Sequence, residues 1–314
     1  MTTQARQLLI TLSNIGDAVM TTPVLTAMHA LHPDALVDIV ADARSAELFE
    51  PCPFRGEILL REKKDGWRGW WRVLRALRGH RYRLIVDLRT DGLSWLLHAQ
   101  RRCTKRRARA QRGHAVERAY AVMAGLLPAG APPPTRLWLA ATDREFAARR
   151  TASLPRGRWL AVAPGANWPP KTWPAAHFRL LLQGLREELD AIVLLGGEGD
   201  RGACAELAAA AGLPVLDLAG GTRLLQAAAV IERARLFIGN DSGLGHIAAA
   251  VGTPTLTLFG PGDPGRYHPW APGAQWLLAP GGEISSLSPT TVIEKARAML
   301  RAPGTRPGQP EAGH

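Results

Sequence analysis

Short apolar segments that end in small polar residues and lead into helices recur along this chain, and they constrain its fold more than any other feature. Apolar strands that alternate with helices predict an α/β fold built on doubly wound parallel sheets. The predicted strands are residues 7–12, 36–40, 84–88, 159–164, 191–196, 215–218, one strand ending at Gly239 and one following the next helix.

A Pro-rich stretch, residues 128–134 (PAGAPPP), divides this series in two. With 314 residues the chain is long enough for two domains, and we expect a ligand cleft between them. Ser288 and Pro289 suit the start of a last helix. The predicted division is therefore 1–150, 151–287, a helix over 288–304 and a disordered tail over 305–314.

Composition indicates a globular chain, with 46% hydrophobic and 21% charged residues. Its apolar runs are shorter than the ~18–20 residues that span a bilayer, and the start shows no signal-peptide pattern. We therefore expect a cytoplasmic protein. Cys52, Cys103 and Cys204 lack metal-site spacing and are expected to be reduced thiols.

The positive charge is concentrated in one segment. Between Arg61 and Arg112 stand 17 Lys or Arg and 4 Asp or Glu, which accounts for the whole net charge of +12. Four tryptophans lie within it. One interpretation is a solvated, Arg-rich face, and the other is a surface for phospholipid headgroups, an acidic glycolipid or nucleic acid. The four tryptophans of this segment are Trp67, Trp70, Trp71 and Trp95.

The stretch 237–264 (FIGNDSGLGHIAAAVGTPTLTLFGPGDP) predicts a phosphate site. A helix that begins directly after a strand presents unpaired N–H groups and the positive end of its dipole. Ser242, Gly243 and Leu244 would supply these N–H groups, with Asp241 and His246 beside them. The alternative is that Asp241 is only an N-cap and His246 only a packed helix residue.

Three more loops follow predicted strands, where open α/β sheets bind ligands. Lys171 is the one charged residue in the loop 164–174 and suits phosphate oxygens, with Asn167 and Thr172 as hydrogen-bonding candidates. Asp17 is a candidate general base or a helix cap. In the third loop, Glu198 and Asp200 suit either ribose hydroxyls or the start of the next helix.

Residues 197–202 (GEGDRG) fit the dinucleotide-binding pattern GxGxxG, but they follow the second strand of their domain and place carboxylates where a pyrophosphate would lie. The sequence has no P-loop, no Asp-x-Asp metal clamp and no GxSxG element. A dinucleotide enzyme and a hydrolase are therefore weaker interpretations than a nucleotide-diphosphate site.

Four segments resemble glycosyltransferase family 9, the lipopolysaccharide heptosyltransferases. They lie in the family's order from Leu8 to Pro264. They are LLITLSNIGDAVMTTPVLTAMHALHPDA, YRLIVDLRTDGLSWLL, VAPGANWPPKTWPAAHF and the 237–264 stretch. The chain departs from the family pattern at Ser13-Asn14, Asn240 and Gly262, which bears on the particular donor and acceptor.

The resemblance implies a GT-B fold, two Rossmann-like domains facing across a cleft, with the last helix crossing back to the first domain. It implies inverting transfer of a heptose from an ADP-activated donor to a lipopolysaccharide core, without a metal or another cofactor. It also implies peripheral association with the inner face of the inner membrane, and no nucleic acid as partner. Alternatives are another nucleotide-sugar donor, a noncatalytic nucleotide-sugar sensor or a nucleic-acid-binding protein.

By resemblance, Asp17 is the catalytic base and Lys171 holds the donor phosphates. Asp241 lies near the donor sugar, and Glu198 matches a ribose-binding carboxylate. The remaining donor-binding assignments are Thr172, Ser242, Gly243, Leu244 and His246. Arg61, Lys63 and Lys64 are the candidates to contact an acidic acceptor.

Overall fold

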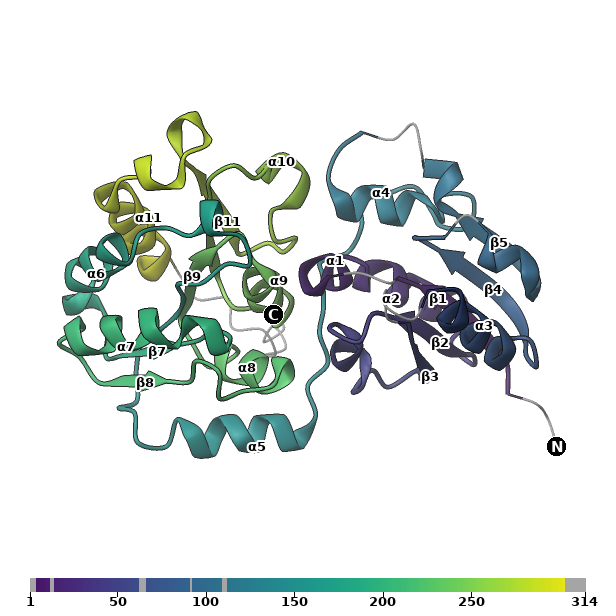
Figure 1. Cartoon of the computed structure of the whole chain (residues 1–314), viewed down its shortest axis with the longest axis horizontal. Coiled ribbons are helices and arrows are strands. Elements are labelled where there is room, and N and C mark those ends of the chain that lie inside the picture. The colour runs from purple at the N-terminus through teal and green to yellow at the C-terminus, as the bar shows by residue number, and fades with distance from the viewer. Residues whose placement is uncertain (1–3, 12–13, 62–65, 91, 109–111, 303–314) are drawn as a thin grey trace, which may run out of the picture. The chain divides into compact units, whose positions relative to one another are not determined.

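The computed structural model describes residues 4–11, 14–61, 66–90, 92–108 and 112–302. The chain forms two compact units, Met1–Trp138 and Leu139–His314. Each unit is an α/β domain with one parallel sheet, and the elements are labelled in Figure 1.

The first unit contains a five-stranded parallel sheet in the order β3-β2-β1-β4-β5. Leu9 in the central strand pairs with Ile39 on one side and with Val86 on the other. The strands are β1 (Arg6–Ile10), β2 (Leu36–Ala41), β3 (Arg55–Leu60), β4 (Arg81–Asp87) and β5 (His98–Thr104).

Successive side chains of β1 point to opposite faces of this sheet, as the period of a strand requires. The Gln7 side chain donates to the Met28 carbonyl of α2 (3.0 Å), whereas Leu8 and Ile10 pack with Val73 of α3. The helices of this unit are α1 (Ile15–Met20), α2 (Thr22–Leu31), α3 (Gly66–Leu77) and α4 (Ala115–Ala121), and η3 (Leu93–Leu96) is a short 3-10 helix.

The second unit contains a six-stranded parallel sheet in the order β11-β10-β9-β6-β7-β8. The four central strands are buried along their whole length, as expected for a parallel sheet that is covered on both faces. The strands are β6 (Trp159–Ala163), β7 (Ala191–Leu194), β8 (Val215–Asp217), β9 (Leu236–Asn240), β10 (Thr255–Phe259) and β11 (Ala274–Leu278).

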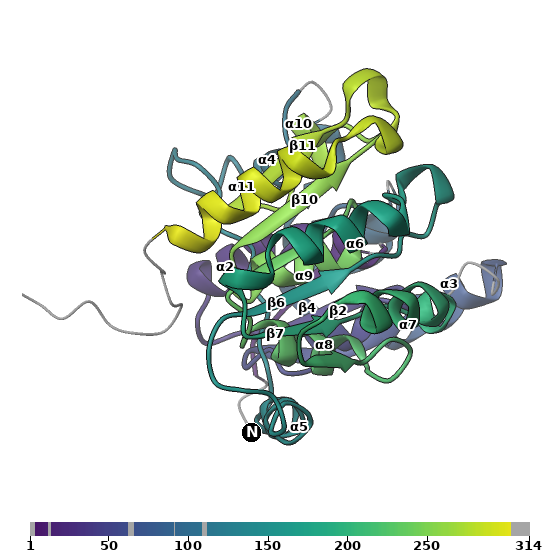
Figure 2. The same ribbon diagram turned by 90° about the vertical axis from the view of Figure 1, so that its left-hand side faces the viewer.

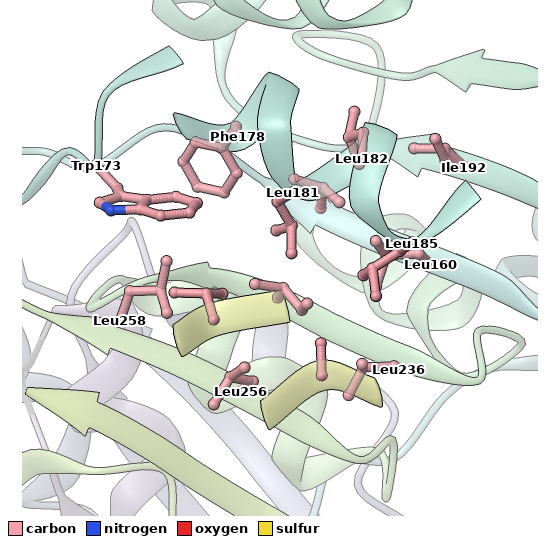
Figure 3. Packing of buried hydrophobic residues seen from close by; sticks show 14 of the residues in the cluster. Leu160, Trp173, Phe178, Leu181, Leu182, Leu185, Ile192, Leu236, Leu256 and Leu258 are labelled. Atoms are coloured by element: carbon pink, nitrogen blue, oxygen red, sulfur yellow. The ribbon is translucent and has the colours of Figure 1, made fainter. Parts of the chain in front are cut away.

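Helices cover both faces of this sheet. On one face lie α6, α7 and α11, and on the other lie α8 and α9 (Figures 1 and 2). Figure 3 shows the core beneath α6, where Phe178 and Leu181 lie above Leu258 and Leu256. The helices are α5 (Ala141–Arg150), α6 (Ala175–Gly184), α7 (Arg201–Ala210), α8 (Leu224–Ile231), α9 (Gly243–Ala250), α10 (Pro264–Tyr267) and α11 (Pro289–Arg301).

The boundary between the units lies before α5, whereas the sequence led us to place it after residue 150. The reason is that α5 packs on α8, and Arg144 of α5 forms a salt bridge with Glu232 (3.0 Å). We expected the last helix to cross back to the first domain. Instead, α11 packs against α6, and its Val292 and Ala296 join the core of the second unit.

The predicted strands are present, and Ser288 caps α11 as expected, its Oγ accepting the N–H of Thr291 (3.2 Å). Three strands were missed: β3, β5 and β11. All three are edge strands that are only partly buried, so they lack the fully buried run that marks the central strands. The short helix η3 ends at Leu96, and His98 begins β5.

Candidate functional site

Each sheet has a topological switch point, the place at which successive connections run to opposite sides. In the second unit it lies between β6 and β9, because the chain runs from β6 to β7 on one side and later adds β9 and β10 on the other. Ligands of open α/β sheets bind outside the carboxyl ends of the strands at such a point. The loops after β6 and β9 therefore form the first place to look for a site.

Asn240, the last residue of β9, fixes the loop after β6. Its side chain is completely buried, accepts the backbone N–H of Trp173 (3.0 Å) and donates to the carbonyl of Pro164 (2.6 Å). The Trp173 indole is also buried and donates to the carbonyl of Leu287 (2.9 Å). Both ends of the 164–174 loop are thus attached to the core of the unit.

This anchored loop brings Lys171 to the end of β9. Lys171 Nζ lies 2.5 Å from Asp241 Oδ2, and both side chains are largely buried, with 29% and 9% of their surface exposed. Gly262 leaves room for this carboxylate, because a Cβ atom at Gly262 would lie 2.7 Å from Asp241 Oδ2. Asp241 is therefore an ion-pair partner of Lys171, and the N-cap position belongs to Ser242.

The N-terminus of α9 follows directly. Ser242 is its N-cap and makes no side-chain cap hydrogen bond, and Gly243 and Leu244 begin the helix beside Asp241. His246 lies one turn further on and is 6% exposed, within the packed part of α9. Thr172 directly follows Lys171. The contact between Lys171 and Asp241 makes the predicted donor-binding residues of the two loops neighbours. The positive end of α9 and the ammonium of Lys171 make this edge of the sheet suitable for an anion.

The loop after β7 joins the same edge of the sheet. Asp200 accepts the N–H of Gly197 (2.8 Å), and Cβ atoms at Gly165 and Gly196 would collide with its side chain. The Asp200 carboxylate thus occupies the space that a pyrophosphate needs in a GxGxxG site, which argues against the dinucleotide interpretation. Glu198 is exposed and pairs with Arg201 (3.0 Å).

The first unit has the same arrangement at its own switch point, between β1 and β4. Asp17 lies in the first turn of α1, after β1, and Arg89 follows β4. Arg89 donates to Asp17 Oδ2 (2.9 Å) and to the carbonyl of Thr11 (3.0 Å). The Asp17 side chain is about one-third exposed and is oriented by this ion pair. If Asp17 served only as a helix cap, the ion pair with Arg89 would have no explanation.

Sequence reasoning missed Arg89, which lies in a segment crowded with arginines. Its loop is held by Asp87, the buried last residue of β4, which accepts the backbone N–H groups of Arg89 (3.1 Å) and Thr90 (2.6 Å). Burial raises the pKa of Asp87, and the hydrogen bonds from Thr90 and the Arg89 N–H act against this rise. The signal that could have identified Arg89 is its place directly after a predicted strand.

The aromatic residues of the basic segment 61–112 differ in their exposure to solvent. Arg61 lies over the ring of Trp70 (4.7 Å from its centroid), and Trp70 packs against the core of the first unit. Trp67 and Trp71 are exposed, so only one of the three tryptophans in α3 is a core residue. The candidates Lys63 and Lys64 lie outside the described residues.

In the described part of the chain, no helix is both long and apolar enough to cross a membrane. Cys52, Cys103 and Cys204 are buried, and as expected none of them is part of a disulfide. Burial raises the pKa of Cys52 to about 11 and that of Cys204 to about 12.

Comparison with known proteins points to one family. Residues 92–296 match the model of glycosyltransferase family 9 (heptosyltransferase). Lipopolysaccharide heptosyltransferase 1 of Pseudomonas aeruginosa is 31% identical, and the match covers 83% of this chain and 80% of that protein.

Two solved structures are similar over 94% of this chain. One is a family 9 glycosyltransferase from Veillonella parvula, with a TM-score of 0.83, 21% identity and 97% of that chain covered, and it supports the fold alone. The other is the ADP-heptose LPS heptosyltransferase II of E. coli, with a TM-score of 0.76, 25% identity and 98% of that chain covered. They confirm the GT-B class, an α/β fold with two Rossmann-like domains. The chain belongs to glycosyltransferase family 9, the heptosyltransferase family.

Proposed function

We propose that this glycosyltransferase moves a heptose from an ADP-activated donor to a lipopolysaccharide core, with inversion at the anomeric carbon. The observation that carries the proposal is the Lys171–Asp241 pair, placed at the switch point of the second sheet beside the N-terminus of α9. The similarity to the E. coli ADP-heptose enzyme supports the choice of donor.

On the donor side, Lys171 and the N–H groups of Gly243 and Leu244 would meet the diphosphate. Asp241 would accept hydrogen bonds from hydroxyl groups of the donor sugar while it keeps Lys171 in place. Its 2.5 Å contact with Nζ supports this double role, because a lysine that is already oriented loses little freedom on binding phosphate. Thr172, Ser242 and His246 complete the proposed donor site, and Glu198 is the proposed ribose ligand.

On the acceptor side, Asp17 would act as the general base. Arg89 occupies Oδ2, so we assign Oδ1 as the oxygen that takes the proton of the acceptor hydroxyl. The hydroxyl oxygen forms a bond to the anomeric carbon while the bond from that carbon to the phosphate oxygen breaks, and ADP departs. Attack opposite the leaving group inverts the anomeric centre.

The negative charge that grows on the departing diphosphate would be met by Lys171 and the α9 N-terminus. Charges and dipoles that are fixed before the reaction stabilise such charge well, and loss of one typically costs about 10²–10³ in rate. We propose that these groups act without a metal ion, so activity should persist in excess EDTA. Loss of activity that Mg²⁺ restores would refute this part of the mechanism.

We further propose that the enzyme works peripherally at the cytoplasmic face of the inner membrane on an acidic glycolipid acceptor. The +12 net charge and its concentration in the first unit support this location, and Arg61 is a described candidate for acceptor contact. Nucleic acid is not an expected partner.

The test combines donor binding with product analysis. Calorimetry of the purified chain with ADP-, UDP- and GDP-sugars should show a preference for ADP-heptose, and mass spectrometry of a core oligosaccharide should show the addition of one heptose. Binding without any product would favour a noncatalytic sensor. Preference for another nucleotide would refute the donor assignment, and affinity for NAD alone would refute the proposal.

A further inference from the structure

Large apolar side chains lie exposed on α3 and η3 of the first unit. Trp67 is 70% exposed, Trp71 52%, Trp95 62% and Leu96 54%. Trp67, Trp71 and Leu96 border one groove, and a contiguous group of large exposed apolar side chains indicates an interaction surface. We call this surface, with the arginines of α3 beside it, the α3–η3 face.

A groove of about 510 Å³ runs between the two helices of this face. Its walls are almost wholly apolar. It reaches Thr90, the neighbour of Arg89, which forms the ion pair with Asp17. The groove is therefore continuous with the loop that orients the proposed base. The main lining residues are Trp67, Trp70, Trp71, Leu74, Leu93 and Leu96.

Positive charge lines the other side of Trp67 and Trp71. Arg68, Arg72 and Arg75 are exposed and border a second hollow of about 910 Å³ together with these two rings. Neither residues 66–81 nor residues 92–112 contain an Asp or a Glu. The face thus combines exposed aromatic rings with exposed cationic groups.

Guanidinium groups also lie close to the exposed rings. The Arg68 guanidinium carbon is 5.8 Å from the ring centroid of Trp67, and that of Arg102 is 5.6 Å from Trp95. Tryptophan favours the interface between water and lipid, where its ring is apolar and its N–H remains hydrated. Arginine extends from the same depth to phosphate groups. A protein partner would need matching acidic side chains, whereas an anionic bilayer supplies both environments at once.

We propose that the α3–η3 face docks on the surface of an anionic lipid bilayer. Trp67, Trp71 and Trp95 enter the interface, and Arg68, Arg72 and Arg75 contact lipid phosphates. This inference rests on the proposed membrane location and adds the surface that makes the contact. Docking in this way brings the Thr90–Arg89 loop, and with it Asp17, next to the headgroup layer.

The test uses vesicles that contain no acceptor, so the result is independent of catalysis. The wild-type chain should co-sediment with phosphatidylglycerol-containing vesicles and not with pure phosphatidylcholine vesicles. In Arg68→Glu/Arg72→Glu, binding should fall by about 25-fold or more, since each arginine near an anionic surface contributes about fivefold. The matched control Arg149→Glu/Arg150→Glu changes the same charge on exposed positions of α5 and should bind more tightly than this variant.

Tryptophan insertion has its own readout. Brominated lipids should quench the fluorescence of the wild-type chain, and most of the quenching should disappear in Trp67→Ala/Trp71→Ala but not in the control Trp276→Ala. Both α3 variants should keep donor binding and transfer to a water-soluble acceptor, which separates failure of docking from failure of the proposed function.

Several outcomes would overturn the docking proposal. These are equal binding to neutral vesicles, equal losses in the control variants, or no vesicle binding by the wild type. A wild-type dimer that Trp67→Ala/Trp71→Ala dissociates, without vesicle binding, would assign the face to a second copy of the chain. Retention on DNA without vesicle binding would assign it to nucleic acid.

Discussion

Replacement of Asn240 by alanine tests how the donor side is built. Asn240 is fully buried, and its amide satisfies the Trp173 N–H (3.0 Å) and the Pro164 carbonyl (2.6 Å). Alanine leaves both backbone groups buried without these partners. Each should lower the free energy of unfolding by about 1–3 kcal/mol, or about 2–6 kcal/mol in total. This is a large part of the ~5–15 kcal/mol that stabilises a typical domain.

We expect Asn240→Ala to lose both thermal stability and affinity for ADP. At about 2–4 °C per kcal/mol for a unit of this size, calorimetry should show the melting temperature of Asn240→Ala lowered by at least about 4 °C. Titration with ADP should also show weaker binding, because the loop that presents Lys171 loses its anchor. The control Asn167→Ala removes the same side chain from an exposed site of this loop and should change stability by less than about 0.5 kcal/mol. A melting temperature and an ADP affinity like those of the wild type in Asn240→Ala would show that this amide does not anchor the loop.

Three further predictions concern individual groups. Lys171→Ala should weaken ADP binding roughly 10- to 100-fold by calorimetry, because a charged contact to phosphate is lost, and unchanged affinity would reject its phosphate role. Arg89→Ala should lower kcat by up to about 10²-fold in steady-state assays, because Asp17 loses its orienting partner, with ADP affinity unchanged. A normal kcat would exclude a positioning role. Because burial raises the pKa of Cys52 to about 11 and that of Cys204 to about 12, these thiols should react with an aromatic disulfide at pH 8 far more slowly in the native than in the unfolded chain. Rapid native labelling at either position would contradict their burial.

The sequence predicts the fold best where strands are buried on both faces. β6 and β7 are continuous apolar runs, β9 is apolar up to its last residue, and β10 (TLTLF) is buried throughout; each was identified. The edge strand β5 (HAQRRCT) was not, because its polar side chains face solvent and only pairing with β4 makes it a strand. Tertiary pairing of this kind leaves little trace in the local sequence.

The same distinction applies to the candidate site. Lys171 and Asp241 each stood out because they follow predicted strands. Their contact depends on the adjacency of β6 and β9, which are brought together from positions 70 residues apart. Arg89 also follows a predicted strand, but its contact with Asp17 depends on the order of the first sheet, which the local sequence does not specify.

In the proposed mechanism, Asp17 performs the chemical step while the second unit holds the donor. The most direct test measures heptose transfer to a core oligosaccharide by mass spectrometry for the wild type and Asp17→Asn, with the ADP-heptose dissociation constant of each from calorimetry. We predict that Asp17→Asn loses transfer by at least about 10²-fold, as expected for a general base, and keeps the donor affinity of the wild type. Transfer at the wild-type rate by Asp17→Asn would contradict the account.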